Sequence, residues 1–333
     1  MQITHATAHH LQREADSQAK LVLRKDEFSI DGQQEALLGN LKRSFTSRLS
    51  RQHGSFSTEN DSSLLENELS VFLKEEHNIS ELSAAFMKQL EHEVNNKGIE
   101  LNSHFLFFEE KSKSQHFFYL LVANQCESLA IDETLDVTSH CYIDTGASLS
   151  GVKIDITEWQ KKGKYPYLTQ VPPKGNVLFS EIMYQFSGFA NAVDKVEATN
   201  AFLEGVESFA KYVPQDKVEE YRDKVVSYCT EQEQKDEPIN IPGLSKELNG
   251  IDCDKFVREM LSHNPKNEEE VMIDRRSLKK YVKFSGREKD LAISFSSFQL
   301  NDRVIYDEVS DTLNIKGLPK ALRNQLIKHL KQS

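Results

Sequence analysis

A run of seven apolar residues in the first half of the chain limits the possible folds more than any other feature. It extends from Phe117 to Ala123 and places apolar side chains at consecutive positions. Because successive side chains of a strand point to opposite faces, such a run is typical of a central strand that is covered on both sides. The run is also far shorter than the roughly 20 apolar residues of a membrane helix. We therefore expect a buried strand at the centre of a sheet.

The segments around this strand predict helices followed by a mainly antiparallel sheet, which is an α+β arrangement. Apolar residues at helical spacing follow the capping residues Asp31 and Asn78, and the charged segment 110–114 is typical of a hairpin. The predicted helices cover residues 37–49, 64–73 and 82–94. The predicted strands cover residues 3–10, 20–24, 103–109, 116–123, 128–131, 135–142 and 152–156.

Two Pro- and Gly-containing segments, at 161–166 and 172–175, predict a domain boundary. We expect an N-terminal α+β domain at residues 1–162 and a C-terminal domain at residues 163–333. The second domain is predicted to be helical at 176–262. Its end, at 271–333, is predicted to be a basic α+β unit with a small sheet and a terminal helix after Pro319, whose leucines would dock on that sheet.

The charge of the chain is distributed unevenly. Residues 275–333 contain 13 Lys and Arg against 6 Asp and Glu, a net charge of +7, so the net charge of −11 for the whole chain leaves −18 for residues 1–274. Clustered cations gain free energy by releasing the counterions condensed on nucleic acid, so the basic end predicts a surface for a polyanion. The alternative is that this basic end pairs with the acidic remainder of the same chain.

The N-terminal residues and the cysteines predict a cytoplasmic protein. Residues 1–10 have no apolar core of the signal-peptide type. The four cysteines, Cys126, Cys141, Cys229 and Cys253, form no Cys-x-x-Cys pair and are interpreted as reduced thiols. We expect no membrane association.

Several blocks of sequence from residue 154 onward carry a family resemblance. They lie at residues 154–159, 226–229, 244–248, 274–278, 283–286, 291–295, 303–307, 311–319 and 322–326. These blocks, in this order, resemble the bacterial 37-kilodalton nucleoid-associated protein family (the NdpA/YejK type). The resemblance implies a cytoplasmic protein found with the bacterial nucleoid. It implies no reaction and assigns no DNA contact to a particular residue.

Patterns that could carry enzyme chemistry are incomplete. Asp144-Thr145-Gly146 is similar to an aspartic-protease loop, but that mechanism requires a second carboxylate loop and a turn also explains it. Glu109 and Lys111 could form half of a metal-dependent nuclease site, for which only Glu100 offers an upstream carboxylate. His140, Cys141 and Cys126 lack the paired spacing of a zinc site. We therefore predict no enzyme, no catalytic residue, no metal and no cofactor.

The leading hypothesis is a non-enzymatic nucleoid-associated protein that binds nucleic acid, with double-stranded DNA favoured, and with little sequence specificity. Tyr281 and Phe284 alternate with lysines as in a strand that could stack bases or lie half-buried. The predicted contacts are cations of the C-terminal region: Arg275, Arg276, Lys279, Lys280, Lys283, Arg287, Lys320, Arg323 and Lys328.

A second hypothesis belongs to another class of protein. The acidic residues 1–274 could make the protein an adaptor that docks on a DNA-handling enzyme, a topoisomerase for example. The protein would then reach the nucleoid through that partner. A metal-dependent nuclease is the third hypothesis. The sequence leaves open whether the protein forms a homodimer.

Overall fold

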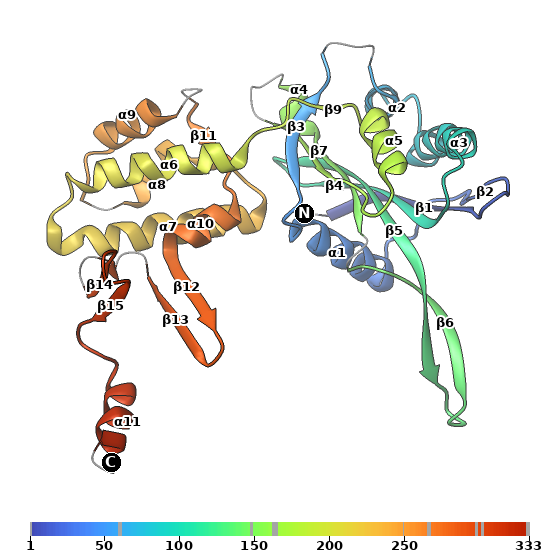
Figure 1. Ribbon diagram of the computed structural model, residues 1–333. Coiled ribbons are helices and arrows are strands. Elements are labelled where there is room, and N and C mark those ends of the chain that lie inside the picture. The colour runs from blue at the N-terminus through green and yellow to red at the C-terminus, as the bar shows by residue number, and fades with distance from the viewer. Residues whose placement is uncertain are drawn as a thin grey trace. The chain divides into compact units, whose positions relative to one another are not determined.

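The computed structural model describes residues 2–58, 62–146, 149–161, 166–248, 250–264, 268–296, 299–300 and 303–330. Its internal contacts divide the chain into two compact units, Met1–Val193 and Asp194–Ser333 (Figure 1). The first unit carries a large antiparallel sheet with helices, and the second is mainly helical with small hairpins. The predicted α+β class is confirmed.

One antiparallel sheet organises the first unit. Its strands run in the order β2-β1-β4-β5-β7-β8-β3-β9, and β6 pairs with the far half of β5. The strands are β1 (Gln2–Arg13), β2 (Lys20–Leu23), β3 (Gln52–Phe56), β4 (Leu101–Lys111), β5 (His116–Ile131), β6 (Val137–Ile143), β7 (Ser150–Asp155), β8 (Leu168–Val171) and β9 (Phe189–Ala190).

The predicted central strand is the first half of β5, and it contributes to a core on each face of the sheet. Phe118, Leu120 and Val122 lie in the core that also contains residues of α2 (Leu64–Leu73), α3 (Ile79–Lys97) and α5 (Val177–Ser187). The alternate residues Phe117, Tyr119, Leu121 and Ala123 lie in the core formed with α1 (Gly32–Thr46). The expectation that this strand is covered on both sides is confirmed.

Local sequence signals set the ends of α3. The Asn78 side chain accepts a hydrogen bond from Glu81 N, and the Glu81 side chain accepts one from Asn78 N, so the helix begins with a capping box. Gly98 ends it with a φ of 64°, a left-handed conformation that glycine adopts without a steric penalty.

The contacts place the division of the chain later than the predicted boundary at 162/163. The short helix α4 (Ile156–Gln160) and the helix α5 both belong to the first unit. The cause is the apolar face of α5, which is buried in the core of the sheet through Phe179, Ile182, Met183 and Phe186. The predicted breaker segment at 172–175 forms the connection between β8 and α5 within the first unit, and residues 162–165 lie outside the described part of the chain.

The second unit has a helical core of its own. Its helices are α6 (Lys195–Ala210), α7 (Val218–Lys235), α8 (Ile241–Glu247), α9 (Cys253–His263) and α10 (Arg275–Val282), with a short 3-10 turn at Gln215–Lys217 and the strand pair β10 (Ile239–Asn240) and β11 (Glu270–Val271). Phe209, Tyr221 and Phe256 pack at its centre. Two hairpins and a helix follow: β12 (Lys283–Glu288) with β13 (Leu291–Ser296), β14 (Val304–Asp307) with β15 (Thr312–Ile315), and α11 (Lys320–Leu330).

Two expectations for the C-terminal region are corrected. Tyr281 and Phe284 alternate with lysines as in a strand, but residues 275–282 form the helix α10, because Leu278 and Tyr281 face the helical core. The final helix forms as predicted, but its leucine stripe does not dock on a sheet, since every residue from Lys320 to Leu330 is exposed. In the described part of the chain, no helix combines the length and the apolar character needed to cross a membrane.

Candidate nucleic-acid interface

The helix α10 is fixed to the second unit at its N-terminus. Asp274 precedes the helix, and its Oδ1 accepts hydrogen bonds from Ser277 N at 2.8 Å and from Ser277 Oγ at 3.0 Å. The Asp274 backbone N donates to Thr199 Oγ1 on α6 at 2.7 Å. An aspartate at this position satisfies backbone N–H groups that the first helical turn leaves unpaired. The residue therefore both begins α10 and ties it to α6.

The inner face of α10 is held by apolar packing and by a half-buried hydrogen bond. Leu278 is buried, and Tyr281 packs beside it. The Tyr281 hydroxyl donates to Glu207 Oε1, and Glu207 Oε1 also accepts from Arg222 Nε at 2.9 Å. Burial, together with the hydrogen bond to Glu207, raises the pKa of Tyr281 above its usual value. Tyr281 is thus committed to anchoring α10, and the prediction that it could stack bases is replaced by this role.

The outer face of α10 carries three of the predicted contact residues. Arg276, Lys279 and Lys280 are exposed. Residues three and four positions apart lie on the same face of a helix, so these cations share one surface. Arg275 lies nearer the body of the unit, with Nε 3.8 Å from Glu233 Oε2 on α7. This geometry leaves three cations directed to solvent from a helix whose opposite side is fixed.

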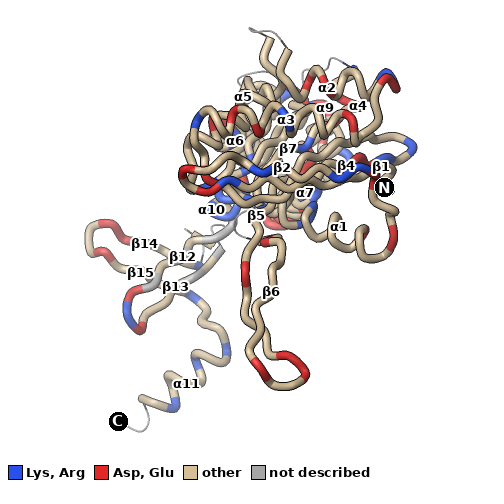
Figure 2. The backbone as a smooth tube through the Cα atoms, turned by 90° about the vertical axis from the view of Figure 1, so that its right-hand side faces the viewer, with Lys and Arg blue, Asp and Glu red and all other residues tan. Residues whose placement is uncertain are grey.

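The remaining predicted contacts are not brought into this group by the described structure. Lys320, Arg323 and Lys328 lie on α11, which is exposed over its whole length, and the blue segments of Figure 2 mark them. The side chains of Lys283 and Arg287, on β12, lie outside the part that the structure describes. Phe284 is half-exposed and packs against Phe295 across the hairpin, with ring centroids 5.5 Å apart.

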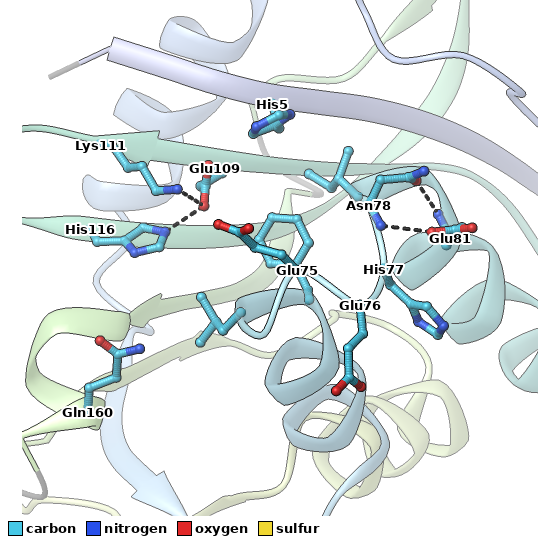
Figure 3. Close-up of a pocket in the computed structure, with 13 residues that line it drawn as sticks. His5, Glu75, Glu76, His77, Asn78, Glu81, Glu109, Lys111, His116 and Gln160 are labelled. Atoms are coloured by element: carbon cyan, nitrogen blue, oxygen red, sulfur yellow. Dashed lines mark hydrogen bonds and ion pairs between the residues drawn. The ribbon is translucent and has the colours of Figure 1, made fainter.

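A pocket in the first unit contains the residues considered for a nuclease. Glu109 is fully buried at its floor; its Oε1 lies 2.8 Å from Lys111 Nζ and 2.6 Å from His116 Nε2, and its Oε2 accepts a hydrogen bond from Thr4. Figure 3 shows the side chains of Glu109, Lys111 and His116 pointing toward one another, with Glu75 extending from the opposite wall. Burial alone would raise the pKa of Glu109, but the hydrogen bonds from His116, Lys111 and Thr4 lower it to about 2.

The sequence pointed to Glu109 and Lys111 but missed His116 and Thr4. The hairpin register places His116 directly opposite Lys111, so the hairpin prediction contained that signal, whereas Thr4 requires knowledge of the β1–β4 pairing. Glu100 precedes β4 while Glu109 lies near its end, about 30 Å along an extended chain, so they do not share a site. Among the described residues, no group of three or more His, Cys, Asp or Glu side chains is arranged to hold a metal ion.

The other chemical candidates occupy turns and strands. Asp144 Oδ1 accepts a hydrogen bond from Gly146 N at 2.7 Å, which is a turn contact of the kind expected for that sequence. Cys126 pairs with Tyr142 and Cys141 pairs with Glu127 in the β5–β6 ladder. Because neighbouring pairs point to opposite faces, the two cysteines face away from each other. All four cysteines are free thiols.

The family model for the nucleoid-associated protein YejK matches residues 7–323. The chain belongs to this family. Similar proteins include nucleoid-associated proteins of Pseudomonas putida strain GB-1, 26% identical over 330 residues and 98% of each chain, and of Klebsiella pneumoniae strain 342, 28% identical over 329 residues, 98% of this chain and 97% of the relative. That of Pectobacterium carotovorum strain PC1 is 27% identical over 329 residues. The predicted resemblance to the NdpA/YejK family and the nucleoid-associated role are confirmed.

Proposed function

We propose that this member of the YejK family binds nucleic acid directly, as a non-enzymatic protein, through phosphate contacts of its basic C-terminal region. Double-stranded DNA is the favoured form. The contacts start from the exposed cations of α10, Arg276, Lys279 and Lys280, with Arg275 at their margin. The other proposed contacts are Lys283, Arg287, Lys320, Arg323 and Lys328.

The observation that supports this proposal is the fixed orientation of α10. Its inner face is held by Leu278, Tyr281 and the Asp274 cap, so its three outer cations project from a rigid support. Side chains that are already positioned lose less conformational freedom when they meet a phosphate backbone. Contacts of this kind fix a protein on a duplex but carry no sequence information, which fits binding with little specificity.

A titration of the full-length protein with duplex DNA at several salt concentrations tests the proposal. If about six cations contact phosphates together, the logarithm of the binding constant falls with the logarithm of salt concentration at a slope near −5. A double variant, Lys279→Gln with Lys280→Gln, is expected to make that slope shallower by about 2, because each lost phosphate contact removes about 0.9.

The matched control is Lys88→Gln with Lys97→Gln, which removes two exposed lysines from α3 in the acidic part of the chain. The control is expected to keep the salt slope of the original protein. Equal slopes for both double variants, or binding that does not respond to salt, would contradict a phosphate interface on α10.

The adaptor hypothesis is an alternative outcome of a related experiment. If the protein reaches the nucleoid only through a partner, purified protein does not bind duplex DNA. A tagged protein then still retains its partner from lysate treated with nuclease. Direct binding predicts the opposite pair of results.

A further inference from the structure

The far half of β5 and the strand β6 form a two-stranded ribbon that leaves the main sheet, as Figure 1 shows below the label β5. The ladder continues from the pair Gln125–Ile143 to the pair Ile131–Val137. An isolated two-stranded ribbon is only marginally stable in water, because it has no layer to bury its apolar side chains. A covering partner would supply that layer.

One face of the ribbon is apolar and uncovered. Residues opposite each other in the ladder share a face, and so do alternate residues along a strand, so Leu129, Ile131 and Val137 lie on the same face. Their exposed fractions are 78%, 70% and 68%. The other face carries Ser128, Thr138 and His140 together with Cys126, Ala130 and Tyr142, so the large aliphatic side chains near the tip are confined to the first face. This alternation is the pattern of a sheet with one buried face, although no described layer covers it.

The charges of the ribbon indicate which surface properties a covering partner must have. Residues 125–144 contain five acidic residues and no Lys or Arg: Glu127, Asp132, Glu133, Asp136 and Asp144. Figure 2 shows the acidic positions at the tip beside β6. Two such ribbons placed together would repel each other, and a phosphate backbone would be repelled as well. The partner must therefore combine an apolar surface with positive charge.

The helix α11 of the same chain has both properties. Leu322, Leu326 and Leu330 form a stripe with exposed fractions of 44%, 44% and 74%. Lys320, Arg323 and Lys328 are its charged residues, and the described helix contains no Asp or Glu. At about 1.5 Å per residue its 11 residues span about 16 Å, and the seven ribbon pairs span about 23 Å, so the helix fits along the ribbon.

We propose that the ribbon of one chain docks on the helix α11 of a second copy, with Leu129, Ile131 and Val137 against the leucine stripe. A reciprocal exchange covers both apolar faces of both chains and closes with two-fold symmetry, so association stops at a dimer. Arg323 borders the stripe and meets the acidic ribbon, so in the dimer it is not among the cations that contact phosphate. Lys320 and Lys328 lie on the opposite side of the helix by its period of 3.6 residues, and they stay exposed in the dimer.

The oligomeric state of the full-length protein provides the first test. Sedimentation is expected to give a mass of two chains of 38.1 kDa. Leu129→Asp and Leu326→Asp are each expected to weaken the dimer about tenfold or more, because each places a carboxylate in the apolar contact. Ser128→Asp and Asn324→Asp add the same charge to the opposite faces of the ribbon and helix, and are expected to leave the dimer intact. Circular dichroism spectra that match that of the original protein establish that all four variants fold.

Crosslinking distinguishes exchange between chains from docking within one chain. In a background with Cys126, Cys141 and Cys253 replaced by Ser, one preparation carries Leu129→Cys and another carries Leu326→Cys. A short bismaleimide added to the mixture is expected to join one chain of each kind, and Ser128→Cys in place of Leu129→Cys is expected to reduce the yield. A monomer in sedimentation, a dimer that tolerates both Asp substitutions, or failure of the mixed crosslink overturns the proposal.

Discussion

The Tyr281 hydroxyl on α10 donates a hydrogen bond to Glu207 on α6, and Arg222 on α7 donates to the same carboxylate. The basic helix is thus joined to two helices of the unit core by one half-exposed carboxylate, whose side chain is 40% exposed. A hydrogen bond to a charged group typically contributes about 1.5–3 kcal/mol, so this contact has a measurable share in holding α10.

Replacing Tyr281 with Phe is expected to lower the free energy of unfolding by about 1 kcal/mol, since the ring stays while the hydrogen bond to the partly solvated Glu207 is lost. Urea denaturation measures this difference in the free energy of unfolding. Tyr212→Phe, at a tyrosine whose side chain is 57% exposed, is the matched control and is expected to change stability by less than about 0.5 kcal/mol. Equal effects of the two substitutions would show that the hydrogen bond between Tyr281 and Glu207 does not stabilise the fold.

Replacing Glu109 with Gln is expected to destabilise the first unit by about 2 kcal/mol, because His116, Lys111 and Thr4 lose a charged acceptor at a buried position. Thermal or urea unfolding measures the loss. Glu158→Gln removes a carboxylate that pairs with Lys161 at the surface, and is expected to have an effect below about 0.5 kcal/mol. A Glu109 variant as stable as the Glu158 variant contradicts the expectation.

Buried His9 predicts a pH dependence of stability. Its Nδ1 accepts from Arg24 N at 3.1 Å, so its Nε2 carries the proton and donates to Ser83 Oγ at 2.8 Å. Burial lowers the pKa of His9 from 6.5 to about 4. The unfolded chain therefore binds a proton more readily below pH 6.5, and stability falls between pH 6.5 and pH 4.

The fall attributable to His9 is expected to reach about 3 kcal/mol at pH 4, at about 1.36 kcal/mol per unit of pKa. Denaturation curves at intervals across this pH range measure it. His9→Gln cannot take up a proton, so its stability is expected to decline less steeply over the same interval, whatever its stability at neutral pH. Parallel curves for the two proteins would rule out His9 as the titrating group.

Gly151 in β7 is a position where a side chain does not fit. Its φ is 136°, and an added Cβ would lie 2.2 Å from the backbone oxygen of Leu120 on β5. Gly151→Ala is expected to destabilise the protein by about 3 kcal/mol or more, since backbone must move in the middle of the sheet. Gly32→Ala, where an added Cβ meets nothing within 4 Å, is the control and is expected to be neutral within about 1 kcal/mol.

The two possible boundaries predict different behaviour of truncated chains. A fragment of residues 1–193 retains α5 and is expected to unfold cooperatively. A fragment of residues 1–162 loses α5, which contributes Phe179, Ile182, Met183 and Phe186 to the main core, and it also loses β8. Such a fragment is expected to show no cooperative transition in circular dichroism. If the shorter fragment unfolds cooperatively, the boundary predicted at 162/163 describes a folding domain after all.

Sequence patterns were most informative where local and tertiary preferences agree. The apolar run at 117–123 predicts a doubly covered strand because no other arrangement buries consecutive apolar side chains in a strand. The helix α10 escaped prediction because Tyr281 and Phe284 alternate with lysines at strand spacing. The cap at Asp274 was a local sign of a helix, but the contacts of Tyr281 with Glu207 and of Asp274 with Thr199 come from residues more than 70 positions away.

The candidate site could likewise be predicted only in part from the sequence. The cations of α10 and α11 could be named from composition, because charge is a property of sequence. Their grouping could not, since it depends on which face of each helix is covered: α10 is anchored through Leu278, whereas α11 is exposed throughout. Thr4, one partner of Glu109, likewise depends on strand pairing between residues 105 positions apart.

The strand β5 has 16 residues and runs without interruption from the doubly covered centre of the sheet to the tip of the ribbon. Its inner half is hydrogen-bonded on both sides, to β4 and β7. A pull on the ribbon is therefore carried along a continuous backbone into the interior of the unit, where two ladders resist it in shear. The ribbon is therefore fixed only at the end that joins the sheet, and a force applied at its tip is transmitted through β5 to β4 and β7.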